Sequence, residues 1–142
     1  MLKHTGSIKS TSIKETGQEC EIDELRTYIG SKTNECWICY AINRKTKQVV
    51  DFTVGRRTKE NIAKVVRGVL SLSPAKIYTD RLNIYPGLIP KNLHSTKFRQ
   101  TNYIERMNLT LRTHIKRLSC KTICYSKSIA MLTACLKIYF WG

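Results

Sequence analysis

The sequence predicts an α/β domain in which a mixed β-sheet is covered by helices. Three strand-like apolar runs come first, a helical pattern and further short runs follow, and two more helical patterns close the chain. The 142 residues and the hydrophobic content of 42% are sufficient for one domain with a single core. We expect the folded domain over residues 19–142. Residues 1–18 are polar and are expected to form a flexible basic arm or the remnant of a preceding domain.

The first part of the domain has the pattern of an antiparallel meander. Apolar, β-branched and aromatic residues form three runs that we interpret as strands, at residues 20–29, 36–42 and 49–54. Gly55 interrupts the third run, and Thr58 has the position of a helix N-cap. Apolar residues at helical spacing then predict a helix that ends before Pro74: Ile62, Val65, Val66, Val69 and Leu70.

The second part mixes short strands with helices. Residues 76–80 read as a strand with Asp80 at its C-terminal end, and residues 93–97 as a fifth strand. The stretch between them is interrupted by Pro and Gly and offers at most a short helix. Two helices are expected at about 101–118 and 126–139. In such sheets, ligands tend to lie beyond the C-terminal ends of strands.

The charge balance indicates a polyanionic partner. The chain has 25 Lys and Arg against 10 Asp and Glu, a formal net charge of +15 at pH 7. Because the basic residues are spread along the folding sequence, nucleic acid is favoured over an anionic membrane, which would favour a concentrated basic tail or amphipathic helix. The sequence lacks a window of about 18 apolar residues and an apolar secretory signal, so we expect an intracellular, soluble protein.

Two acidic residues stand out in the basic second half. From residue 61 onward, Asp80 and Glu105 are the only carboxylate side chains, among fourteen Lys and Arg. Each carboxylate repels phosphate, so a bound divalent cation would explain why both are present. The alternative is that they form ordinary salt bridges, for example to Arg81 and Arg106.

The predicted helix around Glu105 has one apolar seam, formed by Ile104, Met107, Leu111, Ile115 and Leu118. The neighbouring face carries Glu105, Asn108, Arg112 and Lys116. Arg112 follows Glu105 by nearly two turns, which suits a guanidinium that binds phosphate near a metal-bound acid. The same pattern also fits a solvated face of an amphipathic helix.

The residues around Glu105 resemble a known family signature. The segment TNYIERMN at residues 101–108, its continuation through Leu111-Arg112, and YSKS at 125–128 resemble the C-terminal signature of DDE transposases of the insertion-sequence-one family. The segments IDE (22–24) and YTD (78–80) resemble the first and second acidic motifs of that family. The segment GRRT (55–58) resembles its turn after the third strand. The resemblance extends from about Cys20 to the C-terminus.

This resemblance implies an RNase H-like fold with an additional C-terminal helix. It also implies that Asp23, Asp80 and Glu105 are the catalytic residues and hold two Mg²⁺ ions, for which Mn²⁺ can substitute. Two ions about 3.5 to 4 Å apart activate the attacking oxygen and stabilise the leaving one. The reaction implied by the resemblance has two steps: water frees a 3′-hydroxyl at the element end, and that hydroxyl then attacks target DNA.

The implied partner is double-stranded DNA, both the terminal repeats of the element and the target. We expect Arg106, Asn108, Arg112 and Lys116 to contact it. The resemblance also implies a homo-oligomer on paired ends, a DNA-binding N-terminal segment that is fused or separately encoded, and a location on the nucleoid in the bacterial cytoplasm.

Departures from the family motifs leave alternatives open. Leu25-Arg26 stands where the first motif often has Trp as its last residue, and Arg81-Leu82 stands where Gly-Trp is common. The chain can therefore be an inactive or truncated remnant that binds DNA non-specifically. A nuclease that cuts without joining is another alternative. A tyrosine recombinase is a weaker one, suggested by His114, Arg117 and either Tyr125 or Tyr139.

Other candidate ligands are interpreted as structural. Cys36 and Cys39 have the spacing of half a zinc site, which Cys120 and Cys124 would complete, but they lie in apolar runs where cysteine behaves as a small hydrophobe. Glu24 follows Asp23 directly, and adjacent side chains of a strand point to opposite faces. We therefore expect Glu24 to be solvated or structural.

Overall fold

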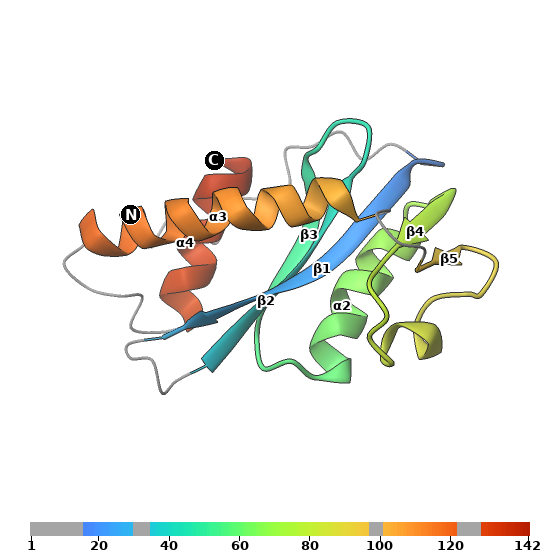
Figure 1. Ribbon diagram of the computed structural model, residues 1–142, viewed down its shortest axis with the longest axis horizontal. Coiled ribbons are helices and arrows are strands. Elements are labelled where there is room, and N and C mark those ends of the chain that lie inside the picture. The colour runs from blue at the N-terminus through green and yellow to red at the C-terminus, as the bar shows by residue number, and fades with distance from the viewer. Residues whose placement is uncertain (1–15, 30–34, 97–100, 122–128) are drawn as a thin grey trace.

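The computed structural model describes residues 16–29, 35–96, 101–121 and 129–142, with the side chains of residues 115–121 outside the description. Within these ranges a five-stranded sheet is combined with helices on both of its faces (Figure 1). The elements in chain order are β1 (Glu19–Tyr28), β2 (Glu35–Asn43), β3 (Val49–Gly55), α2 (Lys59–Leu70), β4 (Lys76–Tyr78), the 3₁₀ turn η1 (Tyr85–Gly87), β5 (His94–Ser95), α3 (Asn102–Lys121) and α4 (Ile129–Trp141).

The sheet has the order β3-β2-β1-β4-β5, so that β1 lies at its centre. β1, β2 and β3 pair antiparallel, which confirms the predicted meander. β4 pairs parallel to β1, and β5 pairs parallel to β4. The tight connection between β2 and β3 is held by the side-chain oxygen of Asn43, which accepts the backbone N–H of Lys45 at 2.9 Å. Lys47, at φ 62°, completes that turn.

Helix α2 covers one face of the sheet. Its N-cap is Thr58, whose side-chain oxygen accepts the backbone N–H of Asn61 at 3.3 Å. Its apolar stripe packs with one face of β1, β2 and β4 in a core that contains Cys20, Ile22, Cys39, Ala41, Ile62, Val65, Val66, Val69, Ile77, Tyr85 and Ile89. The helix ends at Leu70, before Pro74, as the sequence predicts.

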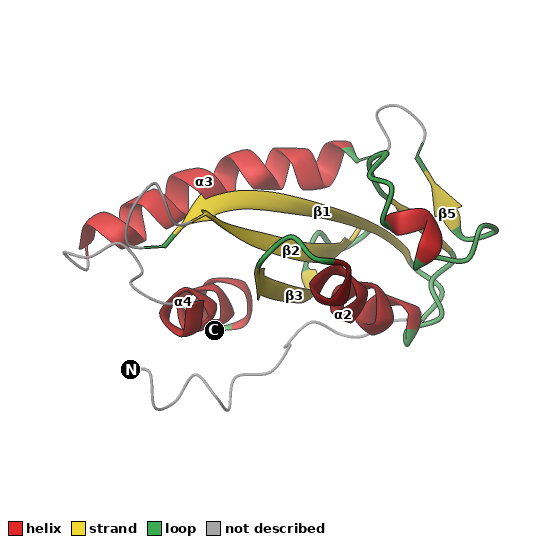
Figure 2. Cartoon of the chain, turned by 90° about the horizontal axis from the view of Figure 1, so that it is seen from below, coloured by secondary structure: helices red, strands yellow, loops and turns green. Residues whose placement is uncertain are grey.

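Helices α3 and α4 pack on a second core. Figure 2 shows α3 running along the side of the sheet opposite to α2. This core contains four buried residues of the two helices, Ile104 and Leu111 of α3 and Leu132 and Leu136 of α4. The strands β1, β2 and β3 contribute the buried residues Leu25, Cys36, Ile38, Tyr40, Ile42 and Val49. The end of α4 is fixed to β3 by the indole N–H of Trp141, which donates to the carbonyl oxygen of Val49 at 2.9 Å.

The alternation of side chains along β1 assigns each acidic residue to one of these cores. Cys20 and Ile22 face the α2 core, and Leu25 faces the α3 core. Period-two alternation therefore directs Glu24 toward α2, and Glu21 and Asp23 toward α3. Three carboxyl groups on consecutive or alternate positions of one central strand thus reach both faces of the sheet.

The observed elements agree with the predicted order and differ at their ends. β4 stops at Tyr78, two residues before Asp80, and β5 is limited to His94–Ser95 within the described residues, shorter than predicted. Residues 30–34, between the first two strands, lie outside the described residues, as do residues 1–15 of the predicted arm. In the described segments we find no helix with the length and apolarity that a membrane span requires.

The first cysteine pair does not form half of a zinc site. Cys36 lies in the α3 core and Cys39 in the α2 core, so the two thiols point to opposite faces of β2. Both side chains are buried and free. Burial raises the pKa of the Cys36 thiol, as expected for a sulfur atom that packs as an apolar group. The side chains of Cys120 and Cys124 lie outside the described residues.

Candidate active site

Asp23 and Asp80 lie beside one another where β1 and β4 part. The parallel register pairs Glu21 with Tyr78, the last residue of β4. Asp23 is two residues beyond Glu21 and Asp80 is two residues beyond Tyr78, and ligand oxygens of the two aspartates lie within 4.8 Å of one another. Because β4 has ended there, the space beside β1 is available to side chains rather than to a hydrogen-bonded strand, which is where ligands of such sheets bind.

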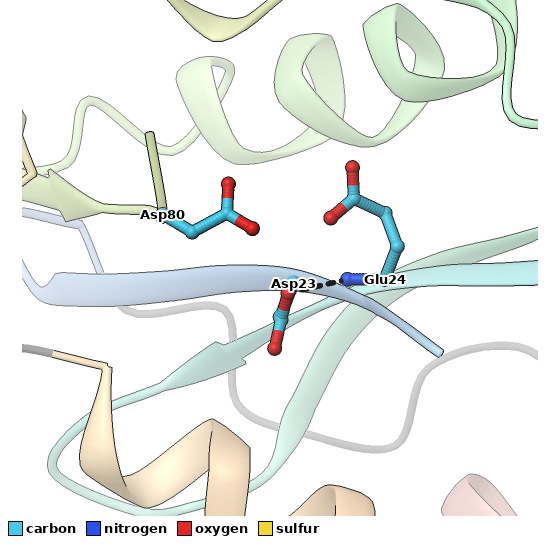
Figure 3. A group of neighbouring side chains, drawn as sticks. All are labelled: Asp23, Glu24 and Asp80. Atoms are coloured by element: carbon cyan, nitrogen blue, oxygen red, sulfur yellow. Dashed lines mark hydrogen bonds between the residues drawn. The ribbon is translucent and has the colours of Figure 1, made fainter. Parts of the chain in front are cut away.

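A third carboxyl group joins this pair. One ligand oxygen from each of Asp23, Glu24 and Asp80 lies within 4.8 Å of the others. Figure 3 shows the carboxyl groups of Glu24 and Asp80 on the same side of β1, turned toward one another, and that of Asp23 on the other side. The backbone N–H of Glu24 donates to Oδ1 of Asp23 at 2.8 Å and keeps that oxygen near the strand.

Glu24 corrects part of our expectation. It does point to the face opposite to Asp23, as strand alternation requires, but it is not solvated, because its side chain is only 1% exposed. Its Oε1 lies 3.7 Å from Nε of Arg57, and neither carboxyl oxygen has a hydrogen-bond partner among the described residues. Sequence alternation gave the direction of this side chain, and only the packing of α2 and η1 shows that it is buried.

Asp23 is connected to helix α3. Its Oδ2 accepts a hydrogen bond of 2.9 Å from Nδ2 of Asn108, and Oδ1 of Asn108 in turn accepts from the hydroxyl of Tyr40. Asn108 is buried. Its amide orients Asp23 inside the protein, and its contact with DNA stays a prediction.

Glu21 connects β1 to the first turn of α3. Its side chain is fully buried, and its Oε1 accepts the backbone N–H of Ile104 at 3.4 Å. Its Oε2 lies 3.8 Å from Nε of Arg44. An acidic side chain near a helix N-terminus is stabilised by the unpaired N–H groups of the first turn. Glu21 thus holds in place the turn that carries Glu105, a role that the sequence pattern did not predict.

Glu105 lies on the Asp23 side of the sheet. Its side chain is exposed, and its Oε1 accepts a hydrogen bond from Oγ1 of Thr101 at 3.0 Å. Its negative charge is close enough to raise the pKa of Asp23. Among the described residues, however, the close group of three carboxylates contains Glu24 and not Glu105. The structure therefore brings together the two predicted aspartates and adds a glutamate that was not predicted.

The carboxyl groups raise one another's pKa. Burial raises the pKa of Asp23, the charges of Asp80 and Glu105 raise it further, and the hydrogen bonds from the Glu24 N–H and Asn108 lower it. Burial, with the charges of Asp80 and Asp23, raises the pKa of Glu24 to about 7 against the opposing effect of Arg57. Burial also raises the pKa of Glu21. Such clusters of desolvated like charges mark functional sites and become favourable when a cation binds.

The predicted phosphate contacts lie on α3. Arg106 and Arg112 are exposed. Lys116 belongs to the same helix, but its side chain lies outside the described residues. A further basic group lies near the carboxylates: the guanidinium of Arg57 is 4.6 Å from the ring centroid of Trp37 and forms the ion pair with Glu24.

Two solved structures with a similar fold are a chain of a viral intasome and an integrase catalytic core. The chain aligns with 89% coverage to a chain of the simian T-cell lymphotropic virus intasome in complex with PP2A regulatory subunit B56 gamma, at a TM-score of 0.60 and 15% identity, and spans 49% of that chain. It also aligns to the HTLV-2 integrase catalytic core domain in complex with magnesium, at a TM-score of 0.59 and 13% identity, covering 89% of this chain and 85% of that one. These likenesses confirm the RNase H-like fold.

Sequence relatives identify the family. The insertion element iso-IS1n protein InsB of Shigella dysenteriae is 41% identical over 110 residues, which cover 78% of this chain and 84% of that protein. The insertion element IS1 4 protein InsB of Escherichia coli K12 is 33% identical over 111 residues, covering 78% of this chain and 66% of that protein. The sequence profile described as IS1 transposase matches residues 18–140. The chain therefore belongs to the IS1 transposase family.

Proposed function

We propose that this member of the family cleaves DNA strands at the ends of an insertion sequence and transfers them to target DNA, with Asp23, Asp80 and Glu105 as its catalytic residues. The observation that carries the proposal is the juxtaposition of Asp23 and Asp80 beside the helix that bears Glu105. Both predicted aspartates come from distant parts of the sequence, and the end of β4 next to β1 brings them together.

The site fits a hard divalent cation, Mg²⁺ or Mn²⁺. All of its candidate ligands are carboxylate oxygens, the type that these ions prefer, and the buried carboxyl groups lack sufficient cationic partners of their own. The integrase catalytic core with a similar fold was solved in complex with magnesium. When bound, a pair of such ions supplies Lewis-acid stabilisation of both the attacking and the leaving oxygen.

The residues of the chain orient this site. Asn108 and the backbone N–H of Glu24 each donate to one oxygen of Asp23, so that its carboxylate is held in one direction. Glu21 accepts a hydrogen bond from the first turn of α3 and so fixes the position, relative to β1, of the turn that bears Glu105. Preorganised ligands of this kind lower the cost of binding an ion and a phosphodiester in the reactive geometry.

The expected substrate is double-stranded DNA, bound next to the carboxylates. The formal net charge of +15 favours association with phosphate, and the exposed Arg106 and Arg112 on α3 lie on the same helix as Glu105. We expect the active form to be a homo-oligomer that pairs two element ends, assisted by a fused or separately encoded DNA-binding segment.

A strand-transfer assay tests the proposal. The full chain is incubated with pre-cut element-end DNA, target plasmid and Mg²⁺ or Mn²⁺, beside the Glu105→Gln variant. Joined product in the wild type that disappears in the variant supports a transposase. Cleavage without joining indicates a nuclease, DNA binding without either reaction indicates an inactive remnant, and a covalent protein–DNA adduct indicates a recombinase. Each of these three results contradicts the proposal.

A further inference from the structure

Glu24 is a buried acidic side chain without the hydrogen bonds that a buried charge requires. Its side chain is 1% exposed, and neither carboxyl oxygen has a hydrogen-bond partner among the described residues. It lies opposite Cys39 in the β1–β2 pairing, on the face whose core includes Tyr85. A desolvated carboxylate without hydrogen bonds is unfavourable unless a cation is bound to it.

The protein cation nearest to Glu24 does not fill this requirement. Nε of Arg57 is 3.7 Å from Oε1, which exceeds the length of a hydrogen bond, and the guanidinium also lies over the ring of Trp37. The hydroxyl of Tyr85 is a further neighbour that lowers the pKa of Glu24, but neither this hydroxyl nor the two carboxyl oxygens have a partner within hydrogen-bond geometry among the described residues. The carboxyl oxygens of Glu24 are therefore available to bind a cation on the side that faces Asp80 (Figure 3).

Asp80 lies where it can bind the same cation as Glu24. Ligand oxygens of Glu24, Asp80 and Asp23 lie within 4.8 Å of one another, a spacing at which one ion can contact all three after small side-chain movements. Asp23 and Glu24 belong to β1, and Asp80 belongs to the segment after β4. Two independent features thus coincide: a close set of oxygen ligands and a buried, unsatisfied carboxylate directed into it.

We propose that Glu24 is a direct ligand of one divalent cation, held together with Asp23 and Asp80 where β4 ends beside β1. The inference rests on the proposed function for the presence of the ion, and it differs from the triad implied by the family resemblance, in which Glu105 is the third ligand. Glu105 lies on the α3 side and outside the close group, so this ion binds without it.

Direct measurement of Mn²⁺ binding tests the inference without catalysis. Isothermal titration calorimetry with MnCl₂ is performed on the full chain without DNA, for wild type, Glu24→Gln and Glu105→Gln. We expect Glu24→Gln to weaken the tightest site by about tenfold or more, because even the loss of a group that only supports a ligand costs 10- to 100-fold. Glu105→Gln is expected to weaken that site less than Glu24→Gln does.

A matched control separates ligation from net charge. Glu35 lies on β2 with its side chain 49% exposed and 3.7 Å from Arg26, so Glu35→Gln removes the same charge from the same sheet. We expect its Mn²⁺ affinity to remain within about twofold of wild type, because solvent and salt screen an exposed charge. Wild-type Mn²⁺ affinity in Glu24→Gln overturns the inference, as does an equal loss in Glu35→Gln.

Thermal unfolding, with and without Mn²⁺, verifies that the variants are folded. Without the ion we expect Glu24→Gln to unfold no earlier than wild type, and with the ion to gain less in Tm. If Glu24→Gln does not fold, Glu24→Asp replaces it in the titration. This variant keeps the negative charge but shortens the side chain by one methylene, so its carboxylate no longer reaches the ion. If folded Glu24→Asp binds Mn²⁺ as tightly as wild type, the inference is overturned. If wild type binds Mn²⁺ through Glu24 but carries out no strand transfer, only the proposed function is overturned.

Discussion

Asn108 donates a hydrogen bond of 2.9 Å to Asp23 and thereby joins helix α3 to the central strand of the sheet. The same side chain accepts from the Tyr40 hydroxyl, so its orientation is determined by β2 as well. Helix α3 bears Glu105 one turn before Asn108. One buried amide therefore contributes both to the direction of Asp23 and to the placement of the helix that bears Glu105.

Replacement of Asn108 by alanine tests this connection. The variant leaves the Tyr40 hydroxyl and one Asp23 oxygen without their partner, so we expect a loss of about 1–3 kcal/mol in the free energy of unfolding. Because Asp23 loses its support, we also expect strand transfer to slow about 10- to 100-fold. Urea unfolding and single-turnover strand transfer measure the two effects. Thr110→Ala, at an exposed position of the same helix, should leave both unchanged.

The buried charge of Glu24 predicts a dependence of stability on pH when no divalent cation is present. Burial raises its pKa to about 7 in the folded chain, from an ordinary value of 4.5. Protonation therefore favours folding: the contribution is fully present below pH 4.5 and is lost as the pH rises through 7. Glu24→Gln should be more stable than wild type at pH 8 by up to about 3 kcal/mol, and nearly equal at pH 4. Urea unfolding in EDTA at both pH values would contradict this if the variant were the less stable protein at pH 8.

The apolar seam of α3 should carry much of its attachment to the sheet. Leu111 is buried, whereas Leu109, two residues earlier on the same helix, is 65% exposed. We expect Leu111→Ala to lower the free energy of unfolding by about 2–5 kcal/mol, because it leaves a cavity in the core. Leu109→Ala should change it by less than about 0.5 kcal/mol. Denaturant unfolding of the two variants compares the same chemical change on opposite faces of one helix, and equal losses would contradict the described packing.

Salt dependence tests the assignment of α3 as the DNA-binding helix. Each phosphate contact contributes about one unit to the slope of log K against log salt concentration. Replacement of both Arg106 and Arg112 by glutamine should therefore reduce the slope by about two units. Arg67 is exposed on α2, on the other side of the sheet, and Arg67→Gln should leave the slope unchanged. Fluorescence anisotropy with labelled duplex DNA at several salt concentrations measures the slopes. An equal effect of the α2 variant would assign DNA binding to overall charge.

Much of the element order follows from the sequence because its causes are local. The N-cap at Thr58, the stripe from Ile62 to Val69 and the break at Pro74 each act within a few residues, and the corresponding helix appears as predicted. A fourth local cause is the turn at Asn43, whose own side chain closes the connection between β2 and β3. The ends of β4 and β5 were less predictable, because short strands depend on the neighbours with which they pair.

The candidate site could be predicted only in part. Asp80 was noticeable as one of two acids in a basic half, and Asp23 and Glu105 through motif resemblance. Glu21 and Asn108 had no such signal, because a strand glutamate and a helical asparagine are ordinary in sequence. Their roles arise from contacts across more than eighty residues, to Ile104 and Asp23 respectively.

By itself the sequence determined the basic charge, the succession of strands and helices, and the opposite directions of the Asp23 and Glu24 side chains on β1. Only the tertiary structure decided that β4 ends beside Asp23, that α2 buries Glu24, and that α3 is bonded to β1 through Glu21 and Asn108. The reason is that direction along a strand follows from local backbone geometry, whereas burial and ligand spacing depend on which distant segments pack together.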